Sequence, residues 1–131
     1  MSETAARLRL LIVESDESVK RVLQRAVAAR FEVTPLASGA SAMGRLREER
    51  FDVVLVDLAL SDIAGLELVR QVRALQPTLP VIVTDPSLDG GDSAELKALG
   101  VIAVLKKPFG AADLGEALAR ASELARPPSR R

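Results

Sequence analysis

Residues 51–68 read FDVVLVDLALSDIAGLEL, and this stretch decides the fold. It contains an apolar run at 53–56 that has neither glycine nor proline and does not alternate with polar residues. Such continuous Val and Leu runs are typical of a strand buried on both faces of a parallel sheet. The run ends at Asp57, and from Leu66 onward apolar residues recur with the spacing of one helix face. The stretch therefore predicts a buried strand, a short loop and a helix.

Comparable apolar runs lie on both sides of this stretch. They cover residues 8–13, 31–36, 81–83 and 101–105, and the run at 31–36 is the weakest. Segments with one-sided helical spacing separate them, and an amphipathic segment follows at 114–124. Five strands that alternate with five helices predict an α/β domain with a doubly wound parallel sheet. Residues 87–93, which include two adjacent glycines, are expected to form a flexible loop before a short fourth helix.

At 131 residues, the chain has the length of one domain with a single core. We expect this domain to span residues 7–125, with residues 126–131 as a tail or the start of a linker, because two prolines follow the last helix. The sequence contains no Cys and no His, which excludes the usual zinc ligands, cysteine nucleophiles and histidine-based triads. Any catalytic chemistry would have to use carboxylates, hydroxyls or lysine.

The charge of the chain is balanced, with 18 basic and 18 acidic residues. This balance gives no domain-wide attraction to nucleic acid or to an anionic membrane, so we expect the domain to bind neither directly. No apolar run reaches the length of a signal-peptide core or of a transmembrane helix. The default expectation is a cytoplasmic protein.

Polar residues follow the predicted strands at the ends that share one edge of a parallel sheet. They are Glu14, Ser15 and Asp16 after the first strand, Asp57 after the third, Thr84 and Asp85 after the fourth, and Lys106 and Lys107 after the fifth. Open α/β sheets bind their ligands outside this edge. Clustered carboxylates are stable as ions when a cation neutralises them, and oxygen ligands without His or Cys favour Mg²⁺. A carboxylate in such a site can attack a phosphoryl group, and a lysine can balance the charge of the phosphoryl oxygens.

Two motifs carry a family resemblance. The stretch 51–68 resembles the surroundings of the phosphoacceptor in the receiver domains of bacterial two-component response regulators. Residues 107–109, Lys-Pro-Phe, resemble the Lys-Pro motif near the end of these domains, and the spacing from Asp57 to the lysine is usual for the family. The resemblance covers residues 8–124 and implies a CheY-like, flavodoxin-like fold with strand order 2-1-3-4-5.

The resemblance also implies roles for single residues. Asp57 would accept a phosphoryl group, Lys107 would contact this group, and the peptide bond between Lys107 and Pro108 would be cis. The donor would be a histidine kinase or a phosphotransfer protein. The domain would not be an enzyme beyond its own phosphorylation and dephosphorylation at Asp57. A structural alternative stays open, in which Lys107 only forms an ion pair with Asp57.

A magnesium site is expected beside Asp57. By the resemblance, Glu14, Asp57 and the backbone carbonyl of Ala59 would hold the ion, and Asp16 is a further candidate ligand. The family carries two adjacent acidic residues after the first strand, whereas this chain has Ser15 in the second place, a neutral and weaker ligand for a hard dication. Asp16 could instead begin the first helix, where a carboxylate is favourable.

Two further positions depart from the family. Its members carry a Thr or Ser 22 residues before the lysine, whose hydroxyl binds the phosphoryl group, and this position is Asp85 here. Thr84 lies one residue earlier, and a shift of one residue in a strand turns a side chain to the opposite face. We expect Thr84 and Asp85 to lie beside the site. Val104 replaces the aromatic residue that the family carries three residues before Lys107.

These observations leave two functions open. The domain could be a phosphoacceptor that signals through its fourth and fifth helices to a downstream protein partner or output domain. It could instead be a pseudo-receiver, a protein interaction module whose state does not depend on phosphate. Asp57 and Lys107 favour the first function, and Ser15, Asp85 and Val104 favour the second. A homodimer through the face formed by the fourth and fifth helices also stays open.

Overall fold

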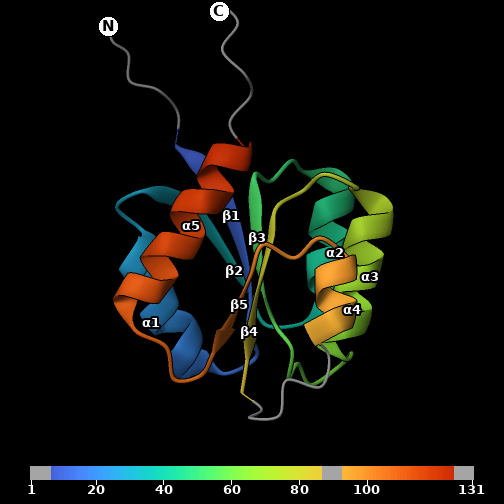
Figure 1. Ribbon diagram of the computed structural model, residues 1–131, viewed down its shortest axis with the longest axis horizontal. Coiled ribbons are helices and arrows are strands. Elements are labelled where there is room, and N and C mark those ends of the chain that lie inside the picture. Colours follow the sequence, from blue (N-terminus) through green and yellow to red (C-terminus); the bar gives the residue numbers. More distant parts are fainter. Residues whose placement is uncertain (1–6, 87–92, 126–131) are drawn as a thin grey trace, which may run out of the picture.

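The computed structural model describes residues 7–86 and 93–125, and within them strands and helices alternate along the chain (Figure 1). The strands are β1 (Leu8–Val13), β2 (Phe31–Leu36), β3 (Val53–Asp57), β4 (Val81–Asp85) and β5 (Ala103–Lys106). The helices are α1 (Glu17–Val27), α2 (Gly39–Glu48), α3 (Gly65–Leu75), α4 (Ser93–Ala98) and α5 (Ala111–Ala125). Most of the predicted loop at 87–93 and the whole predicted tail at 126–131 lie outside the described residues.

The strands form one parallel sheet in the order β2-β1-β3-β4-β5. This arrangement confirms the predicted fold class, the number of strands and their order. β5 begins at Ala103, two residues after the start of the predicted run, because Val101 and Ile102 instead bond to the backbone of Leu96 and Val81. β4 continues to Asp85, so the polar residues Thr84 and Asp85 belong to the strand.

The sheet is covered on both faces, which explains why its strands lack polar alternation. Figure 1 shows α1 and α5 on one face and α2, α3 and α4 on the other. Neighbouring residues of one strand therefore belong to different cores. In β1, Leu11 packs with the α2–α3–α4 side, whereas Leu10 and Ile12 pack with the α1–α5 side, and all three side chains are fully buried. Both faces of the sheet bury apolar surface and so stabilise the fold.

Helices α1, α2 and α3 begin at the carboxyl edge of the sheet, and their first turns are capped in different ways. Asp16 caps α1, because its side chain accepts a hydrogen bond from the Val19 N–H at 3.1 Å. Ser38 caps α2 by accepting from the Ser41 N–H. Ala64 precedes α3 and has no side chain that can cap it. The start of α3 is therefore held by its surroundings and not by a local capping group.

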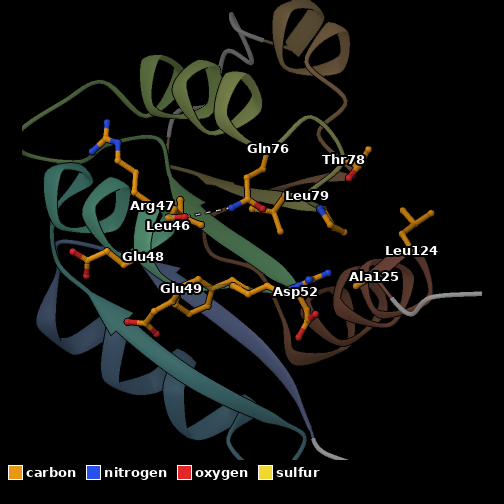
Figure 2. Close-up of a pocket in the computed structure, with 13 residues that line it drawn as sticks. Leu46, Arg47, Glu48, Glu49, Asp52, Gln76, Thr78, Leu79, Leu124 and Ala125 are labelled. Carbon is orange, nitrogen blue, oxygen red and sulfur yellow. Dashed lines mark hydrogen bonds between the residues drawn. The ribbon is translucent and has the colours of Figure 1, made fainter.

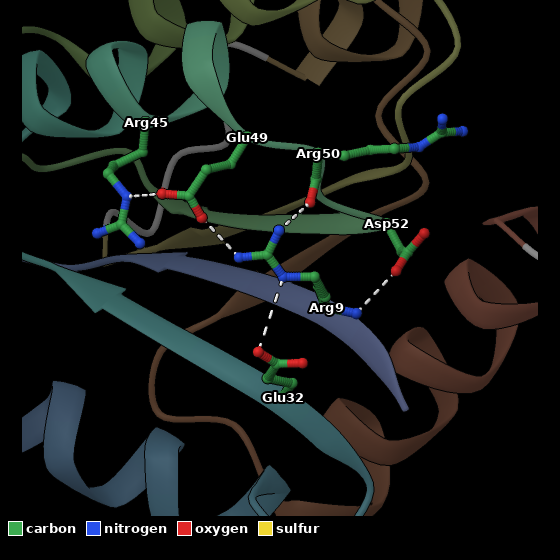
Figure 3. A network of polar contacts seen from close by, with 6 residues as sticks. All are labelled: Arg9, Glu32, Arg45, Glu49, Arg50 and Asp52. Carbon is green, nitrogen blue, oxygen red and sulfur yellow. Dashed lines mark hydrogen bonds and ion pairs between the residues drawn. The ribbon is translucent and has the colours of Figure 1, made fainter. Parts of the chain in front are cut away.

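At the amino edge of the sheet, Arg9 of β1 contacts β2 and the connection between α2 and β3 (Figure 3). Its Nε lies 3.9 Å from Oε2 of Glu32 in β2. Its guanidinium donates to the Arg50 carbonyl oxygen and to Oε1 of Glu49, both at 2.6 Å, and lies 4.6 Å from the centre of the Phe51 ring. Its backbone N–H donates to Oδ2 of Asp52 at 2.7 Å. This network fixes the chain between α2 and β3 against β1.

A second arginine, Arg73 near the end of α3, fixes the other half of this edge. Its guanidinium donates to the carbonyl oxygens of Gln76, Pro77 and Leu79, which follow α3, and to that of Leu99, which follows α4. The fork of the guanidinium suits several acceptors at once. Arg73 therefore binds α3, the start of β4 and the end of α4 to one another.

Between these two networks the surface is hollowed. A groove of about 510 Å³ is formed by the end of α2, the connection from α3 to β4, and the end of α5. Figure 2 shows the side chains that line it. Charged side chains such as Glu48 line it, and the exposed Leu124 stands at its rim. The groove lies at the edge of the sheet opposite to Asp57. In the described part of the chain, no helix is both long enough and apolar enough to cross a membrane.

Candidate functional site

The carboxyl edge of the sheet brings together the strand ends that the sequence singled out. Glu14 follows β1 directly, Asp57 ends β3, and Asp85 ends β4. The register places Asp57 opposite Thr84, and Asp85 opposite Lys106, so that Lys107 follows directly at the edge of the sheet. Residues up to 93 positions apart in the sequence thus meet at one place.

Lys107 joins two buried carboxylates. Its Nζ donates to Oε1 of Glu14 at 3.0 Å and lies 3.6 Å from Oδ2 of Asp57. The side chains of Glu14 and Asp57 are only 2% and 4% exposed, whereas that of Lys107 is 21% exposed. The ion pair between Lys107 and Asp57 is present, and Glu14 is the nearer partner of Lys107. Two carboxylates that share one lysine leave this edge with excess negative charge.

This crowding changes the acidity of Glu14. Burial removes water from its carboxylate and raises its pKa, and the nearby Asp57 raises it further. The hydrogen bonds from Lys107 and from the Asp16 N–H, which reaches Oε2 at 3.1 Å, act in the opposite direction without cancelling the rise. The carboxylate of Glu14 is thus held in a place that would bind a cation favourably.

The raised pKa of Glu14 predicts a pH dependence of stability. Above the ordinary value of 4.5, Glu14 loses its proton in the unfolded chain before it does so in the folded domain, so the folded state binds more protons. The free energy of unfolding should therefore fall as the pH rises from this value to the raised pKa. Urea unfolding at a series of pH values, with a chelator present, should show this fall in the unsubstituted domain. Glu14→Gln should remove it, and an unchanged slope in this variant would contradict the assignment.

Asp57 is fixed by the backbone around it. Its Oδ1 accepts a hydrogen bond from the Ala59 N–H at 3.0 Å, and the Leu58 N–H donates to the Thr84 carbonyl at 2.9 Å. The loop that follows closes where the Gly65 N–H donates to the Leu58 carbonyl at 3.1 Å. At Gly65 a Cβ atom would lie 2.3 Å from Cα of Leu58, so only glycine allows this close approach. The remaining oxygen of Asp57, Oδ2, faces Lys107.

The oxygen donors at this edge of the sheet suit a magnesium ion, whereas the carboxylate of Asp16 has a different partner. Glu14 and Asp57 bring two carboxylates together beside the backbone of Ala59, and magnesium in proteins typically uses one or two carboxylates with water and phosphate oxygens. The carboxylate of Asp16 is engaged at the start of α1, and Ser15 is half-buried next to it. No group of three or more acidic side chains suited to a metal occurs among the described residues. The residues fit a weakly held magnesium ion better than a fully protein-ligated one.

Thr84 and Asp85 both lie beside the site but face opposite ways. Their neighbours in β4 show the alternation, because Ile82 belongs to the α1–α5 core and Val83 to the other core. Thr84 is therefore on the face of Ile82, where its hydroxyl is buried and finds no hydrogen-bond partner in the described parts of the chain. Asp85 is buried on the other face, and its carbonyl accepts from the Lys107 N–H at 2.9 Å.

The structure also describes two other features that the family resemblance singled out, Val104 and the peptide bond before Pro108. Val104 of β5 is half-buried and packs against the α2–α3–α4 core, so this position offers no aromatic ring. The peptide bond between Lys107 and Pro108 is cis, as the resemblance implies. The hydrogen bond between Lys107 and Glu14 was not predicted. It joins the ends of β1 and β5, and no local pattern in the sequence signals it.

The fold and the strand-end site together define a class of protein, and comparisons with known proteins identify it. A model of the response regulator receiver domain family matches residues 10–119. The chain therefore belongs to the response regulator receiver domain family.

Individual relatives fit this assignment. The chain is 32% identical over 115 residues to the response regulator receiver protein CpdR of Brucella abortus, covering 81% of this chain and 89% of CpdR. It is 33% identical over 109 residues to the DNA-binding transcriptional regulator NtrC of Escherichia coli, covering 82% of this chain but only 23% of NtrC.

Solved structures show the same fold. A CheY-like receiver domain protein from Methanospirillum hungatei has a TM-score of 0.85 and 24% identity, over 91% of this chain and 97% of that chain. The chemotaxis response regulator CheY4 of Vibrio cholerae has a TM-score of 0.80 and 26% identity, over 88% of this chain and 99% of that chain.

Proposed function

We propose that this receiver domain accepts a phosphoryl group on Asp57 from a histidine kinase or phosphotransfer protein. The observation that carries the proposal is the place of one buried carboxylate between a backbone N–H and a lysine. Oδ1 of Asp57 accepts from the Ala59 N–H, and Oδ2 lies 3.6 Å from Nζ of Lys107. A carboxylate held in this way presents one oxygen in a fixed direction, as a nucleophile requires.

The chemistry follows from these positions. An oxygen of Asp57 would attack the phosphorus of a phosphohistidine, and the new P–O bond would form as the P–N bond breaks. The electron pair of the broken bond would return to the imidazole nitrogen of the donor. Lys107 would balance the charge of the phosphoryl oxygens by moving from Glu14 toward them. Magnesium, held by Glu14, Asp57 and the Ala59 carbonyl, would neutralise negative charge as the donor approaches.

The signal would then pass by protein contacts to a separate partner or to an output domain.

A second function is supported by specific residues. Asp85 stands where the family carries a hydroxyl, and a carboxylate beside a dianionic phosphoryl group would repel it. Val104 also lacks the aromatic ring of the family. In this alternative the domain is a pseudo-receiver, an interaction module whose contacts do not depend on phosphate.

Addition of magnesium and then of beryllofluoride, a phosphoryl mimic, distinguishes these functions. We expect saturable amide NMR shifts around Asp57 and Lys107, because beryllofluoride would occupy the place of the phosphoryl group on the Asp57 carboxylate. The control is Asp57→Ala, in which these shifts should disappear. If the unsubstituted domain shows no shifts at millimolar concentrations of both additives, the phosphoacceptor proposal fails and the pseudo-receiver is the better description.

A further inference from the structure

The loop between β3 and α3 is tied to a helix that is distant in sequence. Both carboxylate oxygens of Asp62 accept hydrogen bonds from the first N–H groups of α2, from Gly39 at 2.9 Å and from Ala40 at 3.0 Å. These two bonds hold the pKa of Asp62 below its ordinary value. A carboxylate at a helix N-terminus is favoured by the helix dipole and by the unpaired N–H groups. Here the carboxylate comes from another segment, so it joins that segment to α2.

Close packing reinforces this connection. Gly39 is buried, and a Cβ atom at this position would lie 2.3 Å from Cγ2 of Ile63. Ile63 in turn packs on the core between the sheet and α2, α3 and α4. The loop therefore rests against the first residue of α2 through both a polar and an apolar contact. The absence of a side chain at Gly39 is what lets the two segments approach.

The loop also leads directly to the candidate site. It starts at Leu58, next to Asp57, and ends at Gly65, whose N–H bonds back to the Leu58 carbonyl. Within it, the Ala59 N–H orients Oδ1 of Asp57 at 3.0 Å. With both ends of the loop fixed, the position of its middle depends on the hydrogen bonds of Asp62 and on the packing of Ile63. Asp62 lies three residues after Ala59, so a change at Asp62 would act on the Ala59 N–H through a short segment.

We propose that Asp62 is a positioning residue for Asp57: its bridge to Gly39 and Ala40 fixes the β3–α3 loop, and the loop sets the direction of the Asp57 carboxylate. The effect of Asp62 on phosphoryl transfer rests on the function proposed above. Its effect on the Ala59 N–H does not, because this hydrogen bond exists without phosphate. The coupling is reciprocal, so occupation of the site should also protect the Gly39 and Ala40 amides.

The test compares Asp62→Ala with Ser38→Ala in the full chain. Ser38 caps the same end of α2 through the Ser41 N–H, so the second variant removes capping while the bridge from Asp62 to α2 stays in place. In the domain without additives, Asp62→Ala should speed hydrogen exchange of the Ala59 amide by about fivefold or more. Ser38→Ala should leave this rate unchanged. Asp62→Asn keeps one acceptor oxygen and should lie between the unsubstituted domain and Asp62→Ala.

A second variant approaches the loop from the helix. Gly39→Ala retains Asp62 and raises the helix propensity of α2. If Asp62 served only to stabilise α2, this variant should leave the free energy of unfolding unchanged or raise it. Its Cβ instead pushes on Ile63, and we expect faster exchange at Ala59, as in Asp62→Ala. In a domain that accepts phosphate from acetyl phosphate, both variants should lower the initial rate by about fivefold or more, against less than about twofold for Ser38→Ala.

The outcomes separate the two proposals. If Asp62→Ala and Ser38→Ala change Ala59 exchange equally, Asp62 serves only the stability of α2 and the positioning role is overturned. If Ala59 exchange responds selectively while the unsubstituted domain takes no phosphate, the positioning role stands and the phosphoacceptor function fails. If phosphate is accepted at the same rate in all variants, Asp62 does not position the reactive carboxylate.

Discussion

Lys107→Met is expected to lower the free energy of unfolding at pH 7 by about 2 kcal/mol. Removing one partner of a fully buried ion pair costs roughly 3–5 kcal/mol, and the partial exposure of Lys107 reduces this cost. Methionine keeps the apolar stem but leaves the carboxylates of Glu14 and Asp57 without their shared cation. Urea unfolding followed by circular dichroism measures the change. The same substitution should also lower the rate of phosphorylation by a small phosphodonor.

Two controls bear on this expectation. Lys106→Met changes the neighbouring exposed lysine and should alter stability by less than about 0.5 kcal/mol. Adding Glu14→Gln to Lys107→Met removes one of the two unpaired charges, so the double variant should regain part of the lost stability. If Lys107→Met were no worse than Lys106→Met, the ion pair seen between Lys107 and Glu14 would have no energetic role.

Gly65→Ala is expected to lower the free energy of unfolding by about 3 kcal/mol, because the added methyl group meets backbone on the neighbouring segment. Its Cβ would lie 2.3 Å from Cα of Leu58, 2.8 Å from the Asp57 carbonyl oxygen and 2.9 Å from the Leu58 carbonyl carbon. None of these atoms can rotate away. The loop must move instead, and the Asp57 carboxylate with it, so phosphorylation should fall together with stability.

The matched control is Gly115→Ala in α5. A Cβ atom there would meet no atom of another segment of the described chain within 4 Å, so the substitution adds helix propensity without a clash. It should raise the free energy of unfolding by about 0.5–1 kcal/mol. Chemical unfolding of both variants side by side measures the contrast. A Gly65→Ala domain as stable as the unsubstituted one would show that the approach of α3 to Leu58 is less strict than the structure indicates.

The fold could be predicted from the sequence because its strands are signalled locally. The runs at 53–56 and 81–83 are apolar without interruption, and Arg9 is the one polar residue in the run at 8–13, since each strand is covered on both faces. The order of the strands came from the family resemblance, because alternation alone does not fix which strands are neighbours. The start of β5 was predicted two residues early, since Val101 and Ile102 are apolar but pair outside the strand.

The site was predicted less completely than the fold. Strand ends identified Asp57, Glu14 and Lys107, because all parallel strands end at the same edge. Which of these side chains contact one another depends on distances between segments, and the sequence carries no local sign of them. Asp62 is the clearest example. It reads as an ordinary turn residue, yet its partners Gly39 and Ala40 lie more than 20 residues away.

The two edges of the sheet will respond differently to acid. At the amino edge, Arg45 and Arg9 hold the pKa of Glu49 at about 2, so Glu49 keeps its charge in moderately acidic solution. Arg73 binds carbonyl oxygens, which do not titrate. At the carboxyl edge, the Glu14 carboxylate already takes up a proton above 4.5. Mild acid should therefore protonate Glu14 and change the charge of the candidate site, while the contacts of Glu49 and Arg73 at the opposite edge of the sheet persist.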